Sequence, residues 1–250
     1  MALDPDIRRR RRWLRTIADR LAAIYPARSD YREGALSFVD TLVAIILSQN
    51  TSDVNSHRAY TQLRGAWSGW EEVAAADPEE IAGVIAVSGL AAQKSRAIHG
   101  ALRRLLERWG DLRLQGITGV EDEELLEFLT DIPGIGLKSA SCAVMFALDR
   151  DLCAVDTHLH RVLNRLGIVV TSSADRTFHE LRPLLPAGRA REIHVSLIRF
   201  GRDICKARGP HCFECPLYDL CNWEEKEEYA RNPRPGPKPV SGDFLITDGL

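Results

Sequence analysis

The chain has 250 residues, of which 45% are hydrophobic, so it can build one large or two modest domains around a proper core. Its formal net charge of −2 excludes binding of a polyanion through overall charge, so such a function would have to rest on local basic patches. No apolar run is long enough to span a bilayer, and the basic run Arg8 to Arg12 leads into a helical pattern rather than into the apolar region of a signal peptide. We therefore expect a soluble, cytoplasmic protein.

The first half of the chain is predicted to be helical. Residues Arg8 to Arg12 begin the first helix, where they form either a contact surface for a polyanion or a solvated face. Apolar residues then repeat at helical spacing in two further segments, namely Phe38, Leu42, Ile45 and Ile46, and Ile98, Ala101, Leu102, Leu105 and Trp109. No alternating stretch rich in β-branched residues is long enough to predict a strand, which indicates an all-α fold.

The segment from about residue 121 to residue 148 has the pattern of a helix–hairpin–helix. Two apolar helical faces flank the turn Pro133-Gly134-Ile135-Gly136; they consist of Leu125, Phe128, Leu129 and Ile132, and of Ala140, Ala143, Val144 and Ala147. Gly134 and Gly136 permit positive φ and let backbone N–H groups approach a ligand closely. With the N-terminus of the second helix, these groups form an anion site that suits a DNA phosphate. The simpler interpretation is an ordinary αα-hairpin with a glycine turn.

Lys138 lies in the first turn of the second hairpin helix, where a cation opposes the helix dipole. The dipole and partial burial both lower the pKa of a lysine, which favours the neutral amine. A neutral lysine beside DNA is a nucleophile that can form a Schiff base with a sugar carbon. A lysine that only contacts a phosphate is the alternative.

Asp156 is expected to begin another helix, which carries an apolar face and ends at Gly167. N-capping is the commonest role of an aspartate in that position. Asp156 also follows Lys138 by a distance that corresponds to one helix, a turn and a return. The two side chains are therefore predicted to converge on one cleft between two helical bodies.

Four of the six cysteines are spaced C-x6-C-x2-C-x5-C, at Cys205, Cys212, Cys215 and Cys221. Thiolates this close in sequence wrap around one metal centre, and the single C-x2-C knuckle differs from the paired knuckles of a zinc ribbon. A [4Fe–4S] cluster fits this spacing best, with zinc and two disulfides as the alternatives. Cys142 and Cys153 stand in apolar surroundings and are predicted to be buried. The final stretch, Asn232 to Leu250, opens with Pro233, Pro235, Gly236, Pro237 and Pro239, and it is predicted to be an extended tail.

The motifs IPGIGLKSA and AVDTHLHRV, followed by the cysteine spacing, closely resemble the endonuclease III branch of the helix–hairpin–helix DNA glycosylases from about residue 30 to residue 225. The resemblance implies two all-α domains with DNA bound in the groove between them. Residues 35–150 would form a six-helix barrel that contains the hairpin. Residues 1–34 and 151–226 would form the iron–sulfur cluster domain, and residues 227–250 a flexible tail.

The resemblance also implies a function, which is excision of oxidised or ring-saturated pyrimidines followed by strand cleavage at the abasic site. Lys138 would attack C1′ of the flipped nucleotide, while Asp156 would stabilise positive charge on the sugar. The cluster would be structural, and Lys206 and Arg208 beside it would bind phosphates. The expected partner is double-stranded DNA with a damaged base or an abasic site, bound by a monomer.

Two further segments resemble parts of these enzymes that enter the DNA. Residues 47–53, LSQNTSD, resemble the segment whose glutamine fills the space of the flipped base; Asn50 holds the matching position and Gln49 precedes it. Residues 88–90, SGL, resemble the loop that wedges a leucine into the duplex, which makes Leu90 the candidate wedge. Ala91 stands where many relatives carry a tyrosine. The simpler interpretations are a polar helix end for Asn50 and a core position for Leu90.

Two other functions are compatible with these motifs. A monofunctional glycosylase of the same superfamily would act on uracil or mismatched adenine with water as the nucleophile, although such relatives generally lack a lysine at the position of Lys138. A DNA-binding or redox-sensing module would use the hairpin and the cysteines without catalysis, and would make Lys138 and Asp156 incidental.

Overall fold

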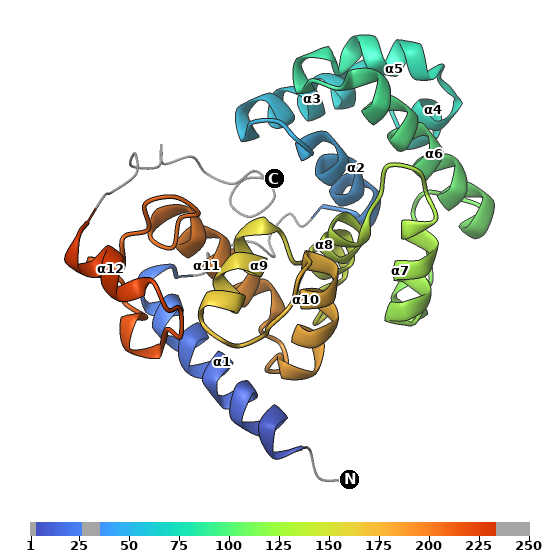
Figure 1. Ribbon diagram of the computed structural model, residues 1–250. Helices are drawn as coiled ribbons and strands as arrows, with labels where there is room; N and C mark the ends of the chain where they lie inside the picture. Colours follow the sequence, from blue (N-terminus) through green and yellow to red (C-terminus); the bar gives the residue numbers. More distant parts are fainter. Residues whose placement is uncertain (1–3, 27–35, 234–250) are drawn as a thin grey trace. The chain divides into compact units, whose positions relative to one another are not determined.

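The computed structural model describes residues 4–26 and 36–233, and within these ranges the regular structure is helical throughout, without a strand (Figure 1). The prediction of an all-α fold is therefore confirmed. The chain divides into two compact units. One unit contains α2 to α8, and the other combines α1 with the chain from Arg150 through α12.

The unit from α2 to α8 is built around a helix that is apolar on all sides. The bounds of its α-helices are α2 Phe38–Ser48, α3 Asp53–Ala66, α4 Trp70–Ala75, α5 Pro78–Val84, α6 Ala91–Trp109, α7 Asp122–Thr130 and α8 Leu137–Leu148. Every side chain of α2 from Thr41 to Leu47 is buried, and α2 packs against α3, α6 and α8. A helix that is hydrophobic all round belongs in the interior, so α2 organises this core.

The other unit contains α1 Pro5–Ile24, α9 Thr157–Arg165, α10 Ala174–Leu181, α11 Ala190–Asp203 and α12 Lys226–Arg231. α1 is amphipathic and packs against α11; its buried stripe consists of Leu14, Ile17, Ala18 and Leu21. α9 packs against both α10 and α11. Short 3₁₀ turns at Cys212–Glu214 and Tyr218–Leu220 connect α11 with α12.

α12 occupies part of the segment that was expected to be an extended tail, since residues Lys226–Arg231 are helical. The rest of the predicted tail, from residue 234 onward, lies outside the described residues. In the ranges that the structure describes, no helix is long and apolar enough to cross a membrane.

Candidate functional site

The predicted hairpin is present between α7 and α8, which pack against each other. Gly134 has φ +93, and a Cβ added there would lie 2.8 Å from Cβ of Ala97 in α6. Only glycine fits that position without strain, because an L-residue is disfavoured at this φ and the space is already filled. The expectation of positive φ at both glycines is wrong for Gly136, which has φ −90 and ψ 174 and open space around its Cα. The structure of the protein itself therefore does not require a glycine at position 136.

Gly136 is the N-cap of α8, and no side chain caps this helix end. The first N–H groups of a helix lack intrahelical acceptors, and the helix dipole adds partial positive charge there. The absence of a Cβ at Gly136 also leaves the approach open. The start of α8 can therefore accept an anion such as a phosphate.

Lys138 is the second residue of α8 and is half-buried. Among the described residues, its amine has neither a hydrogen bond nor an ion pair, whereas its backbone carbonyl accepts a bond from the Ser141 hydroxyl at 3.1 Å. A lysine in the first turn of a helix gains nothing from the dipole. Its placement is therefore not explained by the stability of α8.

Asp156 caps α9, as its position before the apolar face predicts. Its Oδ1 accepts hydrogen bonds from the backbone N–H groups of His158 and Leu159, both at 2.8 Å. Because one oxygen takes both bonds, the half-buried carboxylate keeps Oδ2 available for a second task. Lys138 and Asp156 belong to different units, so their convergence in one cleft stays a prediction.

The turn after α2 carries Gln49 and Asn50. The Gln49 amide donates to the Gly134 carbonyl and to the Ser139 hydroxyl, each at 3.2 Å, so its side chain lies on the hairpin. Asn50 is exposed and has φ 51, a left-handed conformation that asparagine tolerates better than most residues. The turn thus presents one anchored amide and one exposed amide.

Leu90 is exposed over 55% of its surface, which excludes a core position. It precedes α6 with φ 52 and ψ 32, directly after Gly89 with φ 65. A large apolar side chain exposed to water is costly, and a leucine in the left-handed conformation is strained in its backbone. These features suit a side chain that inserts between bases.

Lys94 connects the turn after α2 with the segment before α6, a role that the sequence did not predict. It is 2% exposed, and its Nζ donates to the carbonyls of Leu47 and Ser88, each at 2.8 Å. Burial lowers the pKa of this amine below its usual value. A lysine in an amphipathic helix is usually exposed to solvent, so the sequence gives no sign of this role. Only the tertiary structure shows that the Lys94 amine connects the end of α2 with the segment before Leu90.

The four clustered cysteines line one pocket in the segment Cys205 to Cys221, which we call the cysteine loop. The other residues that line this pocket are Arg165, Leu166, Phe200, Ile204 and Trp223. No disulfide joins cysteines of the loop, and Cys142 and Cys153 are not disulfide-bonded either. Cys142 and Cys153 are 2% and 1% exposed, so the prediction that they are buried is confirmed.

Burial, reinforced by the neighbouring thiols, raises the pKa of Cys212 to about 11 and that of Cys215 to about 12. Burial likewise raises the pKa of Cys221. These thiols therefore stay protonated at neutral pH unless a metal centre supplies positive charge. Within residues 4–26 and 36–233, no group of three or more metal-binding side chains is arranged for a single ion. Four thiols around one pocket supply the number and type of ligands that a [4Fe–4S] cluster would need.

Arg165 is the one cationic residue among those that line this pocket. Its guanidinium lies 3.8 Å from the centre of the Trp223 ring and donates to the Lys206 carbonyl at 2.8 Å and to Cys205 Sγ at 3.5 Å. On the other side, the Lys226 amine donates to the Cys221 carbonyl at 2.6 Å. Both cations partly oppose the rise in the pKa of Cys212 that burial causes, and they would offset the charge of four thiolates.

The predicted basic residues of the cysteine loop lie between its first two cysteines. Arg208 is exposed, whereas Lys206 is half-buried with its amine 3.4 Å from Nε2 of His211. His211 is buried and pairs through Nδ1 with Glu214 at 2.8 Å. Arg208 is therefore the residue of this pair that is freely placed for a phosphate.

Comparison with known proteins agrees with this geometry. Residues 43–187 match the family described as "HhH-GPD superfamily base excision DNA repair protein". The chain is 36% identical over 182 residues to endonuclease III of Thermotoga maritima, covering 73% of this chain and 81% of that protein. The solved structure of a non-covalent endonuclease III–DNA complex is similar with a TM-score of 0.73 and 27% identity, covering 89% of this chain and 99% of the other. A trapped endonuclease III–DNA covalent intermediate is similar with a TM-score of 0.72 and 27% identity, over 87% and 97%.

Proposed function

Because the chain belongs to the HhH-GPD superfamily of base excision DNA repair proteins, and within it to the endonuclease III branch, we propose specific catalytic roles for its residues. The chain is a DNA glycosylase with abasic-site lyase activity. Lys138 is the nucleophile and Asp156 is the carboxylate that assists it. The observation that carries this assignment is that the Lys138 amine, at the open N-terminus of α8, has no partner within residues 4–26 and 36–233.

The reaction begins when the damaged nucleotide leaves the base stack, because C1′ is not accessible within the duplex. The nitrogen lone pair of the Lys138 amine attacks C1′ and the nitrogen gives up a proton, while the N-glycosidic bond breaks and the base leaves with the bonding electrons and takes up a proton. The negative charge of Asp156 stabilises the positive charge that develops on the sugar. Its free Oδ2 suits this task, since Oδ1 is held by the α9 backbone.

The sugar ring then opens, and the amine nitrogen and C1′ form an imine. A proton is then lost from C2′ to solvent, a double bond forms between C2′ and C3′, and the bond between C3′ and its oxygen breaks, so that the strand on the 3′ side leaves with a 5′-phosphate. Water finally hydrolyses the imine and regenerates the lysine. No redox step occurs in this sequence.

Two kinds of group bind the DNA. Some contact its phosphates, and others insert into the duplex beside the flipped base. The N–H groups at Gly134, Gly136 and the start of α8 bind a phosphate, and Arg208 and Lys206 bind others. Leu90 inserts as the wedge, and Asn50 or Gln49 fills the space of the flipped base. The partner is double-stranded DNA with a damaged base or an abasic site, and the chain acts as a monomer.

The substrates are oxidised or ring-saturated pyrimidines. This preference is supported by similarity to endonuclease III and by the attacking lysine. Ala91, the first residue of α6, is the position at which this chain departs from relatives with a tyrosine, so it tunes the choice among damaged bases.

The cysteine loop holds a [4Fe–4S] cluster through Cys205, Cys212, Cys215 and Cys221. Support comes from their shared pocket and from the adjacent Arg165 and Lys226, whose positive charges would offset that of the thiolates. When bound, the cluster cross-links the loop and has no part in the sugar chemistry.

Borohydride trapping tests the catalytic assignment. The wild-type protein is incubated with a duplex carrying one thymine glycol and with an abasic-site duplex, and a covalent adduct is expected with both. Lys138→Ala should abolish both adducts, whereas Lys206→Ala should weaken binding but keep them. An adduct that persists in Lys138→Ala would refute the nucleophile, and base release without trapping in the wild type would indicate a monofunctional enzyme that uses water. An adduct with the abasic duplex alone would overturn the substrate assignment.

A further inference from the structure

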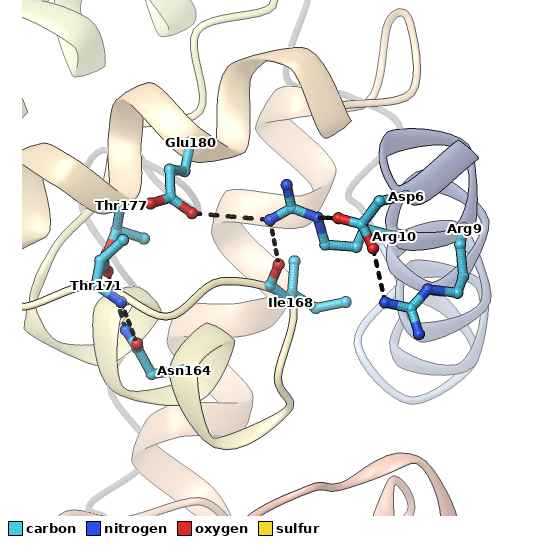
Figure 2. Close-up of polar contacts among 8 residues, drawn as sticks. All are labelled: Asp6, Arg9, Arg10, Asn164, Ile168, Thr171, Thr177 and Glu180. Carbon is cyan, nitrogen blue, oxygen red and sulfur yellow. Dashed lines mark hydrogen bonds and ion pairs between the residues drawn. The ribbon is translucent and has the colours of Figure 1, made fainter. Parts of the chain in front are cut away.

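Helix α1 carries arginines on two faces, and on one of them their charge is compensated. Arg9 pairs with Asp6 at 2.7 Å, and Arg10 Nε pairs with the same carboxylate at 2.9 Å. Figure 2 shows Arg10 between Asp6 and Glu180, with its guanidinium also donating to the Ile168 carbonyl at 3.2 Å. This face therefore fastens α1 to its own unit and has little charge left for a ligand.

The other face carries Arg8, Arg11, Arg12 and Arg15, which follow the i, i+3, i+4, i+7 pattern of residues that share one side of a helix. All four line a cavity of about 770 Å³ within the same unit. The remaining lining residues are Asp151, Arg182, Leu185, Pro186 and Ala187. Five guanidinium groups thus surround a cavity large enough for a ligand of substantial size.

The acidic side chains near this cavity already have partners within the protein. Asp151 is the only acidic residue among those that line it, and its carboxylate accepts hydrogen bonds from the backbone N–H groups of Gly188 at 2.7 Å and Ala190 at 3.3 Å. Asp19, farther along α1, pairs with Arg189 at 2.5 Å. With one carboxylate against five guanidinium groups, the residues that line the cavity carry a net positive charge, which favours an anionic ligand.

The four arginines of this face also lack partners in the described part of the chain. None of Arg8, Arg11, Arg12 and Arg15 has an ion pair there, and Nε of Arg11 is buried without a hydrogen-bond acceptor. The guanidinium groups on this face are therefore not neutralised by carboxylates of the described residues, and their charge is available to a ligand.

We propose that this cavity binds successive phosphates of a duplex DNA backbone, as a contact that does not depend on a damaged base. Guanidinium groups match phosphate oxygens in charge and geometry. Arg8 to Arg15 span about 10 Å along the helix axis at about 1.5 Å per residue, which accommodates two or three phosphates of one strand. The residues that line the cavity include no aromatic ring to stack a base, so a backbone fits better than a free nucleotide.

The site is distinct from the assigned catalytic residues, so the two can fail separately. Lys138→Ala should abolish trapping without changing the affinity for undamaged DNA through this cavity. Loss of arginines from the cavity should weaken duplex binding while a covalent adduct still forms at saturating protein. The proposal would thus survive a failure of the lysine chemistry.

The test compares Arg12→Ala/Arg15→Ala with the charge-matched control Arg103→Ala/Arg113→Ala, whose arginines are exposed on the other unit. Binding of an undamaged fluorescent duplex is measured across a range of salt concentrations, and binding of inorganic tripolyphosphate is measured in parallel. Each contacted phosphate contributes about −0.9 to the slope of log K against log salt. We expect the cavity variant to lose about 2 from the magnitude of this slope and to bind about tenfold more weakly, with the control closer to wild type. Arg12→Lys/Arg15→Lys should restore the slope, because it restores the charge.

Two results would overturn the proposal. If the duplex slope is unchanged but tripolyphosphate binding is lost, the cavity takes a free polyphosphate rather than DNA. If the cavity variant and the control behave alike with both probes, the arginines are only a solvated face. Thermal unfolding of each variant, monitored by circular dichroism, confirms that the comparison is made on folded protein.

Discussion

Helix α2 and the cysteine loop are stabilised in opposite ways. In α2 every side chain from Thr41 to Leu47 is buried, so the helix is held by apolar contacts with its neighbours. In the cysteine loop only Pro210 and Leu217 are buried among the apolar residues, and Phe213 is 47% exposed. Burial of apolar surface contributes about 25 cal/mol per Å², so the loop has little of this term available.

This difference determines how strongly a single substitution destabilises each region. The α2 core can lose one methylene group or one hydrogen bond and still be folded, because many contacts share the stabilisation. The loop depends on the centre that its four cysteines bind, so one ligand can decide its structure. We expect substitutions to change the free energy of unfolding most in the loop, less in the core and least at the surface.

Cys212→Ser should have the largest effect on stability. It removes one ligand of the proposed cluster, and the loop has few buried apolar residues to hold it otherwise. We expect loss of the cluster's visible absorbance and of bound iron, together with rapid proteolysis within the cysteine loop. Absorbance, iron analysis and limited proteolysis measure these changes.

Cys153→Ala is the matched control, since Cys153 is a buried cysteine of the same unit that lies outside the loop. It should cost about 1–2 kcal/mol and leave the iron content unchanged. If Cys212→Ser and Cys153→Ala had equal iron content and equal melting temperatures, the contrast between loop and core would be wrong.

Lys94→Met should have the next largest effect. It keeps most of the side-chain volume but leaves the buried carbonyls of Leu47 and Ser88 without their donor, which costs about 2–4 kcal/mol for the two groups. Activity should fall further than stability alone explains, because the turns that carry Asn50 and Leu90 lose their common anchor. Urea denaturation and single-turnover base excision measure the two effects.

The pH dependence of this effect follows from the lowered pKa of the Lys94 amine. Between its folded pKa and its unfolded value of about 10.4, the unfolded chain binds more protons than the folded one. Folding stability due to Lys94 therefore rises as the pH increases through that window. The difference in unfolding free energy between wild type and Lys94→Met should grow as the pH rises toward the unfolded pKa of about 10.4. A constant difference would show that the amine is not perturbed.

Gly134→Ala and Gly136→Ala should separate a structural glycine from a ligand-facing one. Gly134→Ala should cost about 2–4 kcal/mol, because φ +93 is strained for alanine and its Cβ would lie 2.8 Å from Cβ of Ala97. Gly136→Ala meets no atom within 4 Å and should change stability by less than about 1 kcal/mol. It should nevertheless weaken DNA binding, because the new methyl group stands beside the N–H groups of α8. Equal stability effects would overturn this division.

The sequence predicted the features that depend on local patterns. Helical periodicity identified α2, α6 and the two hairpin helices, and the position of Asp156 before an apolar face predicted the N-cap of α9. It could not predict Lys94, because nothing near residue 94 shows that its amine meets two carbonyls distant in sequence. It also treated Gly134 and Gly136 alike, although only the packing of α6 against the hairpin distinguishes them. Local rules therefore located the elements, and tertiary contacts decided the role of each residue.

Leu90→Ala should have the smallest effect on stability and still impair the enzyme. Leu90 is 55% exposed in a left-handed conformation, so its truncation removes few contacts and should shift the free energy of unfolding by less than about 0.5 kcal/mol. If Leu90 is the wedge, base flipping becomes less favourable by the unstacking energy that its insertion offsets, which is about 1–3 kcal/mol. Excision of a paired damaged base should then slow by about ten- to a hundredfold, whereas cleavage at a preformed abasic site should slow much less. The exposed Val54 provides the control, because Val54→Ala removes a similar apolar surface at 77% exposure. Equal slowing of both reactions in Leu90→Ala would indicate a general loss of DNA binding rather than a lost wedge.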